Sequence, residues 1–167
     1  MAQLYFKYGA MGSSKSANAL MARFNYEERG QATLLVKPQL DTRDGDHMVY
    51  SRIGLKHPCV YFHEMQAMSD ETLQQYACII VDEAQFLTKE EVMYLVYIVD
   101  DLGIPVMCYG LRADFKGDLF PGSEALLVMA STGTAAWTPP IQTTTNGPSG
   151  YSSSSLRTTW HTRPPCP

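Results

Sequence analysis

The chain is poor in cysteine and contains no apolar run long enough to span a membrane. Four of its 167 residues are cysteines and no two form a C-x-x-C pair, which argues against a zinc knuckle and against a disulfide framework. No apolar run reaches the roughly 20 residues of a transmembrane helix, so we expect no membrane partner. The first residues form a strand pattern without a signal-peptide cleavage site, and we therefore expect a cytoplasmic protein.

Acidic residues are absent from the last 37 residues. Residues 1–130 contain 17 acidic and 11 basic residues, a net charge of −6 that argues against nucleic acid as a partner. In residues 131–167, Ser, Thr, Pro and Gly occupy 24 of 37 positions. Such a segment buries too little apolar surface to offset the entropy of ordering it. The sequence therefore predicts one folded domain at 1–130 and a low-complexity, disordered tail at 131–167.

A phosphate-binding motif lies near the start of the chain, between an apolar run and a helical pattern. It fits the form G-x-x-x-x-G-K-[ST] except that Ser14 replaces the second glycine, which costs about 1–2 kcal/mol if the backbone there has positive φ. In such a loop, backbone N–H groups and the helix dipole attract phosphate. The residues predicted to bind the phosphates of ATP are Gly9, Ala10, Met11, Gly12, Ser13, Ser14, Lys15 and Ser16. Ser16 would also offer its hydroxyl to Mg²⁺.

Apolar strand patterns alternate with helical patterns along residues 1–130. Buried strands are predicted at 3–8, 33–36, 78–81 and 106–109, and helices from the loop to about residue 29, at 69–75, at 88–102 and at 123–130. Thr88 and Glu91 match a capping box. Residues 52–55 and 60–62 favour short strands or a flap. This order predicts an α/β fold of the P-loop, RecA-like type, with a mostly parallel sheet flanked by helices.

A pair of carboxylates, Asp82 and Glu83, follows the buried strand at 78–81. The carboxyl ends of parallel strands are where α/β sheets place their chemistry. Asp82 would hold Mg²⁺, and Glu83 would act as a base on a hydroxyl or a water. The alternative is an ordinary acidic pair at the end of a strand, but its combination with the phosphate loop favours phosphoryl transfer.

Residues 1–130 resemble the type II thymidine kinases of bacteria. The resemblance rests on YFKYGAM at 5–11, KS at 15–16, NYEERG at 25–30, DTR at 41–43, SRIGL at 51–55, DEAQF at 82–86 and YGLRADF at 109–115. It implies transfer of the γ-phosphoryl group of ATP to the 5′-hydroxyl of thymidine or deoxyuridine, in nucleotide salvage for DNA synthesis. It also implies assembly as a homo-oligomer, a tetramer in this family.

The resemblance also implies individual roles. Glu83 is the catalytic base in this interpretation. Additional contacts to the ATP phosphates come from Asp41, Arg43, Asp82 and Gln85, and the nucleoside pocket from Phe86, Leu111 and Phe115. Arg43 would stabilise the transferred charge, although a solvated turn is the alternative for that loop.

The tail departs from the family pattern. The family continues into a zinc module with C-x-x-C spacing and a lasso loop that covers the nucleoside, and neither is present in residues 131–167. A shifted reading frame or a foreign terminus would explain the change in composition. We therefore predict no zinc site and impaired thymidine turnover. Two other functions stay open: an ATP-binding protein without kinase turnover, and a fragment of a helicase-like ATPase, since DEAQ also resembles a helicase motif.

Overall fold

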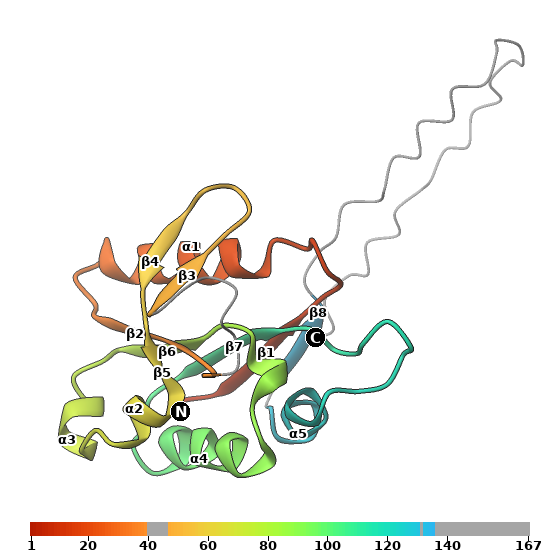
Figure 1. Cartoon of the computed structure of the whole chain (residues 1–167). Coiled ribbons are helices and arrows are strands. Elements are labelled where there is room, and N and C mark those ends of the chain that lie inside the picture. Colours follow the sequence, from red (N-terminus) through yellow and green to blue (C-terminus); the bar gives the residue numbers. More distant parts are fainter. Residues whose placement is uncertain (40–46, 131, 136–167) are drawn as a thin grey trace, which may run out of the picture.

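The apolar runs form parallel strands of one sheet. A computed structural model of the chain describes residues 1–39, 47–130 and 132–135. In this part of the chain the sheet order is β5-β2-β6-β7-β1-β8, and every neighbouring pair is parallel (Figure 1). The strands are β1 (Leu4–Tyr8), β2 (Thr33–Lys37), β5 (Val60–Tyr61), β6 (Cys78–Val81), β7 (Val106–Gly110) and β8 (Thr132–Ala135). The predicted α/β fold with a mostly parallel sheet is confirmed.

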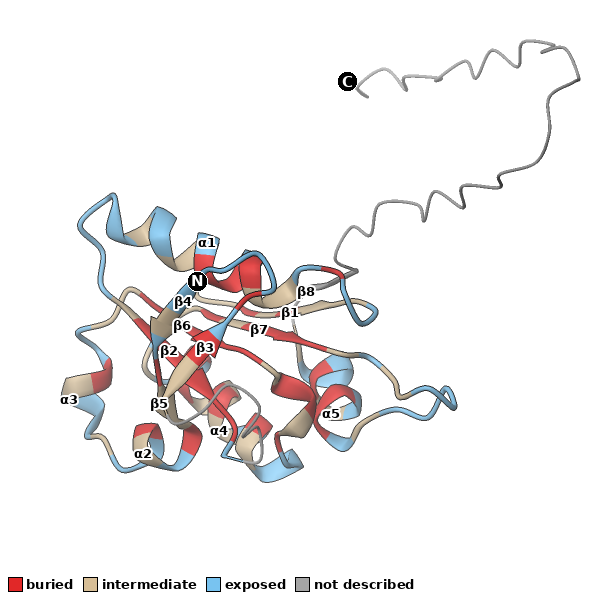
Figure 2. Cartoon of the chain, turned by 45° about the horizontal axis from the view of Figure 1, so that its top comes forward, coloured by how far each residue is buried: buried red, intermediate tan, exposed pale blue. Residues whose placement is uncertain are grey.

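Helices cover both faces of the sheet, and each strand sends alternate side chains to the two sides. In β2, Leu34 and Val36 pack into a core that also contains side chains of α2 (Phe62–Gln66), α3 (Asp70–Leu73), α4 (Lys89–Asp100) and α5 (Pro121–Met129). Leu35 packs on the opposite side with side chains of α1 (Lys15–Glu27). The central strands β2, β6 and β7 are therefore mostly buried from both directions (Figure 2), which explains why they are continuous apolar runs.

The helix α4 begins at the predicted capping box. The backbone N–H of Glu91 donates to Oγ1 of Thr88 at 3.2 Å, and the backbone N–H of Thr88 donates to Oε2 of Glu91 at 2.8 Å. Both donors would otherwise be unsatisfied at the start of the helix. Within the described ranges, no helix is long and apolar enough to cross a bilayer.

The region predicted as short strands or a flap is a hairpin followed by a sheet strand. Antiparallel β3 (Met48–Tyr50) and β4 (Lys56–Pro58) form the hairpin, and residues 52–55 lie in its turn rather than in a strand. The turn is closed by the N–H of Ser51, which donates to the carbonyl of Leu55 at 2.7 Å, and Gly54 there has φ 87°. Of the two alternatives, the structure rules out a strand at 52–55, whose apolar side chains belong to a turn, and places a strand at Val60–Tyr61.

The tail contains a strand that the composition did not predict. Disorder was predicted from residue 131, but Thr132–Ala135 form β8, which pairs in parallel with Tyr5–Tyr8 of β1. A short Thr/Gly/Ala segment has no hydrophobic period, so its strand depends on the exposed hydrogen-bonding edge of β1. The rest of the predicted tail, 136–167, lies outside the described residues.

Candidate functional site

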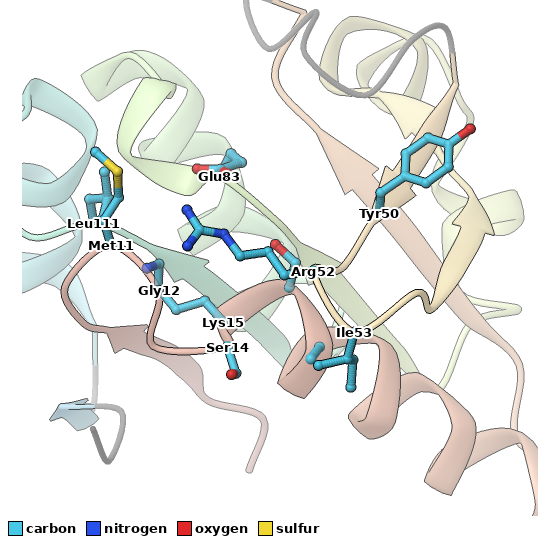
Figure 3. A pocket seen from close by; sticks show the side chains of 11 residues that line it. Met11, Gly12, Ser14, Lys15, Tyr50, Arg52, Ile53, Glu83 and Leu111 are labelled. Carbon is cyan, nitrogen blue, oxygen red and sulfur yellow. The ribbon is translucent and has the colours of Figure 1, made fainter. Parts of the chain in front are cut away.

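A cavity of about 270 Å³ lies at the carboxyl ends of the central strands (Figure 3). Its walls come from the loop between β1 and α1, the segment after β6, the residue after β7 and the β3–β4 hairpin. The lining residues are Met11, Gly12, Ser14, Lys15, Ser16, Ala17, Tyr50, Arg52, Ile53, Glu83 and Leu111. Ligands of open α/β sheets bind at this edge, so the fold and the cavity agree on one candidate site.

The loop after β1 contains two residues in the left-handed backbone conformation. Gly12 has φ 86° and Ser14 has φ 56°, so the residue that departs from the phosphate motif does adopt the left-handed conformation. The first turn of α1 carries no acidic residue that would neutralise the positive end of the helix dipole. The Lys15 ammonium group lies over the loop, where it donates to the carbonyl of Ala10 at 2.8 Å and to Oγ of Ser13 at 3.3 Å.

The acidic pair after β6 divides between the protein interior and the cavity. Asp82 is buried, and its backbone N–H donates to the carbonyl of Val36 at 2.9 Å. Glu83 turns into the cavity with φ 53°, a left-handed conformation that non-glycine residues rarely adopt. Strained backbone of this kind clusters at functional sites. The structure therefore brings Glu83 to the same cavity as Lys15 and Ser16, although more than 60 residues separate them in sequence.

Gln85 does not line the cavity. It belongs to the 3-10 helix η1 (Ala84–Phe86), and its side chain is only 1% exposed. Its Nε2 donates to Oε2 of Glu83, and its Oε1 accepts a hydrogen bond of 3.0 Å from the backbone N–H of Leu111. The predicted contact of Gln85 with phosphate has no support in this geometry, because both ends of its amide are bonded to protein atoms.

The three residues predicted for a nucleoside pocket lie in different surroundings. Leu111 lines the cavity. The ring of Phe86 packs edge to face against Phe120, with the ring centroids 6.0 Å apart. Phe115 is 92% exposed on the loop between β7 and α5, and the structure does not bring it to the cavity. Asp41 and Arg43, which were predicted to contact phosphate, lie outside the described residues.

The sequence profile of the family described as "Thymidine kinase" matches residues 2–135 of this chain. The chain belongs to the thymidine kinase family. Curated thymidine kinases are 48% identical over 135 residues in Zymomonas mobilis, and 46% identical over 132 and 136 residues in Escherichia coli K12 and Legionella pneumophila strain Paris. The matches cover 76–78% of this chain and 64–70% of the relatives, so the chain spans about two thirds of their length.

Solved structures give a weaker likeness to this thymidine kinase family member. The structure of Bacteroides Pif1 bound to ssDNA aligns with a TM-score of 0.49 and 14% identity, over 80% of this chain and 38% of that one. The family assignment rests on the family profile and the sequence relatives, not on these structures.

The family match ends at residue 135, the last residue of β8, which lies past the predicted domain boundary at 130.

Four cavity residues were not identified from the sequence as members of the site: Ala17 in the first turn of α1, and three residues of the hairpin. Tyr50, Arg52 and Ile53 come from the β3–β4 hairpin, opposite the loop of the thymidine kinase motif (Figure 3). Arg52 extends across the cavity, and its Nη1 lies 3.5 Å from the position that a Cβ on Gly12 would occupy. The SRIGL segment matched the family, but only the hairpin shows that it faces the phosphate loop.

The predicted ligands for Mg²⁺ are Ser16 and Asp82. In the described part of the chain, no group of three or more His, Cys, Asp or Glu residues is placed to hold a metal ion. Mg²⁺ in phosphate sites commonly takes one or two protein oxygens and completes its shell with phosphates and water. Ser16 lines the cavity, whereas Asp82 is 2% exposed and is not a lining residue, so only Ser16 of the two predicted Mg²⁺ ligands lies at the cavity.

Proposed function

We propose that this chain binds ATP at the loop between β1 and α1 and transfers its γ-phosphoryl group to the 5′-hydroxyl of thymidine. The observation that carries the proposal is the single cavity lined by Lys15, Ser16 and Glu83. A phosphate cradle and a carboxylate base on the same cavity are the parts that phosphoryl transfer to a hydroxyl requires. Family membership supports thymidine as the acceptor.

Lys15, Ser16 and Glu83 of the cavity, together with the buried Asp82, have separate roles in the proposed reaction. The 5′-oxygen of thymidine forms a bond to the γ-phosphorus while the bond from that phosphorus to the β,γ-bridging oxygen breaks. The hydroxyl proton passes to the carboxylate of Glu83, and ADP leaves with the electrons of the broken bond. Lys15 and the loop N–H groups, contributed by residues 9–16, hold the β- and γ-phosphates. Ser16 and Asp82 would hold Mg²⁺, which neutralises phosphate charge when it is bound.

Arg52 provides a second cation for the transferred group. Its guanidinium group faces the phosphate loop from the hairpin, whereas Lys15 lies on the loop itself (Figure 3). A cation on each side would counter the charge that spreads over the equatorial oxygens in the transition state. We propose Arg52 for this role, and Arg43 stays a prediction because it lies outside the described residues.

The test is a radiolabel assay of the full chain with [γ-³²P]ATP, Mg²⁺ and thymidine, run beside the Glu83→Gln variant. We expect labelled thymidine 5′-monophosphate from the unchanged chain and a rate lower by about 10²–10⁴-fold in Glu83→Gln, because removal of a general base costs that much. ATP affinity, measured by calorimetry, should stay within a factor of three. Glu90→Gln, on the exposed first turn of α4, is the control.

Two outcomes would contradict the proposal. If Glu83→Gln transferred phosphate at the unchanged rate, Glu83 would not be the base. If the unchanged chain bound ATP but formed no labelled nucleotide, the ATP-binding alternative without kinase turnover would replace this proposal. DNA-stimulated ATP hydrolysis would instead favour the helicase-like alternative.

The finer sequence predictions about this chain stay predictions. We propose that it forms a homo-oligomer, acts without nucleic acid and lies in the cytoplasm. We also propose that thymidine turnover is lower than in relatives that carry the zinc module and lasso. Light scattering tests the oligomer. Comparison of kcat with the Escherichia coli relative tests the turnover.

A further inference from the structure

A partly buried chain of hydrogen bonds runs from Glu83 to the start of α5. The Nε2 of Gln85 donates to Oε2 of Glu83, and the Oε1 of Gln85 accepts from the backbone N–H of Leu111 at 3.0 Å. The carbonyl of Leu111 in turn accepts a hydrogen bond from Oγ of Ser123. Gln85 is 1% exposed and Ser123 is fully buried, whereas Glu83 and Leu111 are partly exposed where they line the cavity.

The orientation of the Gln85 amide follows from its partners. A backbone N–H can only donate, so the group that faces Leu111 has to be the amide oxygen. The amide nitrogen therefore faces Glu83 and donates to its carboxylate. One oxygen of the Glu83 side chain is in this way tied to a buried group, which restricts the rotamers of a residue that already has a strained backbone.

Two glycines make room for the segment that carries Gln85. A Cβ on Gly110 would lie 2.7 Å from Oε1 of Gln85 and 3.0 Å from its backbone nitrogen. A Cβ on Gly122 would lie 2.6 Å from the carbonyl oxygens of both Ala84 and Leu87. The end of β7 and the start of α5 therefore close directly against the backbone of residues 84–87.

We infer that Gln85 is a positioning residue, which holds the carboxylate of Glu83 at the cavity through a bridge to Leu111, with Ser123 holding Leu111 from behind. This inference rests on the role proposed for Glu83 and replaces the predicted contact between Gln85 and phosphate. Because Leu111 itself lines the cavity, the bridge also sets the distance between the base and the wall contributed by β7.

The experiment compares three variants of the full chain with a stability control. Gln85→Met keeps the volume and removes both hydrogen bonds. Gln85→Glu keeps the acceptor for Leu111 but places a carboxylate against Glu83. Ser123→Ala removes the outer bond alone, and Thr88→Ala is the control because it weakens the α4 cap without removing a hydrogen bond of the bridge.

We expect kcat to fall by about 10–100-fold in Gln85→Met and Gln85→Glu, with KM for ATP within threefold, because a misplaced base slows only the chemical step. Ser123→Ala should lower kcat by about two- to fivefold. The amide of Leu111 should exchange faster with deuterium in Gln85→Met and keep its protection in Gln85→Glu. Thr88→Ala should melt earlier at unchanged kcat.

An unchanged kcat together with unchanged Leu111 exchange in Gln85→Met would overturn the inference. A large rise in KM for ATP at constant kcat would overturn it too, and would return Gln85 to the phosphate site. If the unchanged chain transferred no phosphate at all, the proposed function would fail. The bridge would then be judged on Leu111 exchange alone, where wild-type protection in Gln85→Met counts against it.

Discussion

The loop after β1 and the segment after β6 both reach the cavity, but they differ in what surrounds them. Ala10, Met11, Gly12 and Ser14 of the loop are exposed, and its hydrogen bonds run mostly within the loop and the first turn of α1. In residues 82–87, by contrast, Asp82, Ala84, Gln85 and Leu87 are buried against β7 and α5.

This difference shows that the two halves of the site depend on different parts of the sequence. The loop is built from consecutive residues, so a short motif contains nearly all that determines its shape. The segment with Glu83 depends on residues about 25–40 positions later, which close around it in the folded chain. Loop substitutions should therefore change ATP affinity, whereas substitutions around residues 82–87 should change stability and the rate of chemistry.

The largest effect is expected at Gly122, where the segment after β6 has no spare volume. Gly122→Ala should lower the free energy of unfolding by about 2–3 kcal/mol, because the new Cβ meets three backbone oxygens within 2.9 Å and backbone cannot move aside cheaply. Urea unfolding followed by circular dichroism measures this. Glu124→Ala, exposed on the same helix, should stay within about 0.5 kcal/mol. Equal stability of the two variants would contradict the close packing described for α5.

The second effect concerns Lys15 in the loop between β1 and α1, whose substitution should change the affinity for ATP rather than the free energy of unfolding. Lys15→Met should raise the Kd for ATP by about 10–100-fold, because charge-assisted contacts to phosphate are lost. Its free energy of unfolding should change by less than about 1 kcal/mol, since the surrounding loop is exposed. Calorimetric titration with ATP is the measurement. Lys89→Met, at the start of α4, is the control, because it removes the same charge outside the loop. Unaltered ATP affinity in Lys15→Met would contradict the proposal that this loop binds the phosphates of ATP.

A smaller effect tests the strain at Ser14. Ser14 has φ 56° and ψ 29°, a left-handed conformation that is unfavourable for a residue with a Cβ. Its side chain makes no cap hydrogen bond that would offset this conformational energy. Ser14→Gly should therefore stabilise the fold by about 0.5–1 kcal/mol, after part of the gain is lost to the greater freedom of glycine in the unfolded chain. Ser14→Ala keeps the Cβ and should give no gain. A gain of equal size in Ser14→Ala would show that φ is not the reason.

The smallest effect is the low reactivity of the two cysteine thiols in β6 and β7, Cys78 and Cys108. Burial raises the pKa of the Cys78 thiol to about 11, and burial likewise raises the pKa of the Cys108 thiol well above its ordinary value. At pH 8 both thiols are therefore protonated and unreactive. Iodoacetamide labelling read by peptide mass spectrometry should find both unmodified in the native chain and modified in urea. Rapid native labelling would show that the sheet opens near β6 and β7.

The sequence by itself determined the features that are local. The apolar runs predicted four strands of the sheet, the T-x-x-E pattern predicted the cap of α4, and the glycine and lysine spacing predicted the loop. These features depend on neighbouring residues, so they could be recognised without the fold. The convergence of Glu83 on this loop also followed, because parallel strands bring their carboxyl ends to one edge.

Only the tertiary structure decided the features that need distant partners. The hairpin places Arg52 across from Gly12, the amide of Gln85 bonds to Glu83, and β8 pairs with the edge of β1. Phe115 is 92% exposed because, in the described part of the chain, no distant element covers its loop. Each of these depends on contacts between segments far apart in sequence, and a local pattern carries no information about which segments meet.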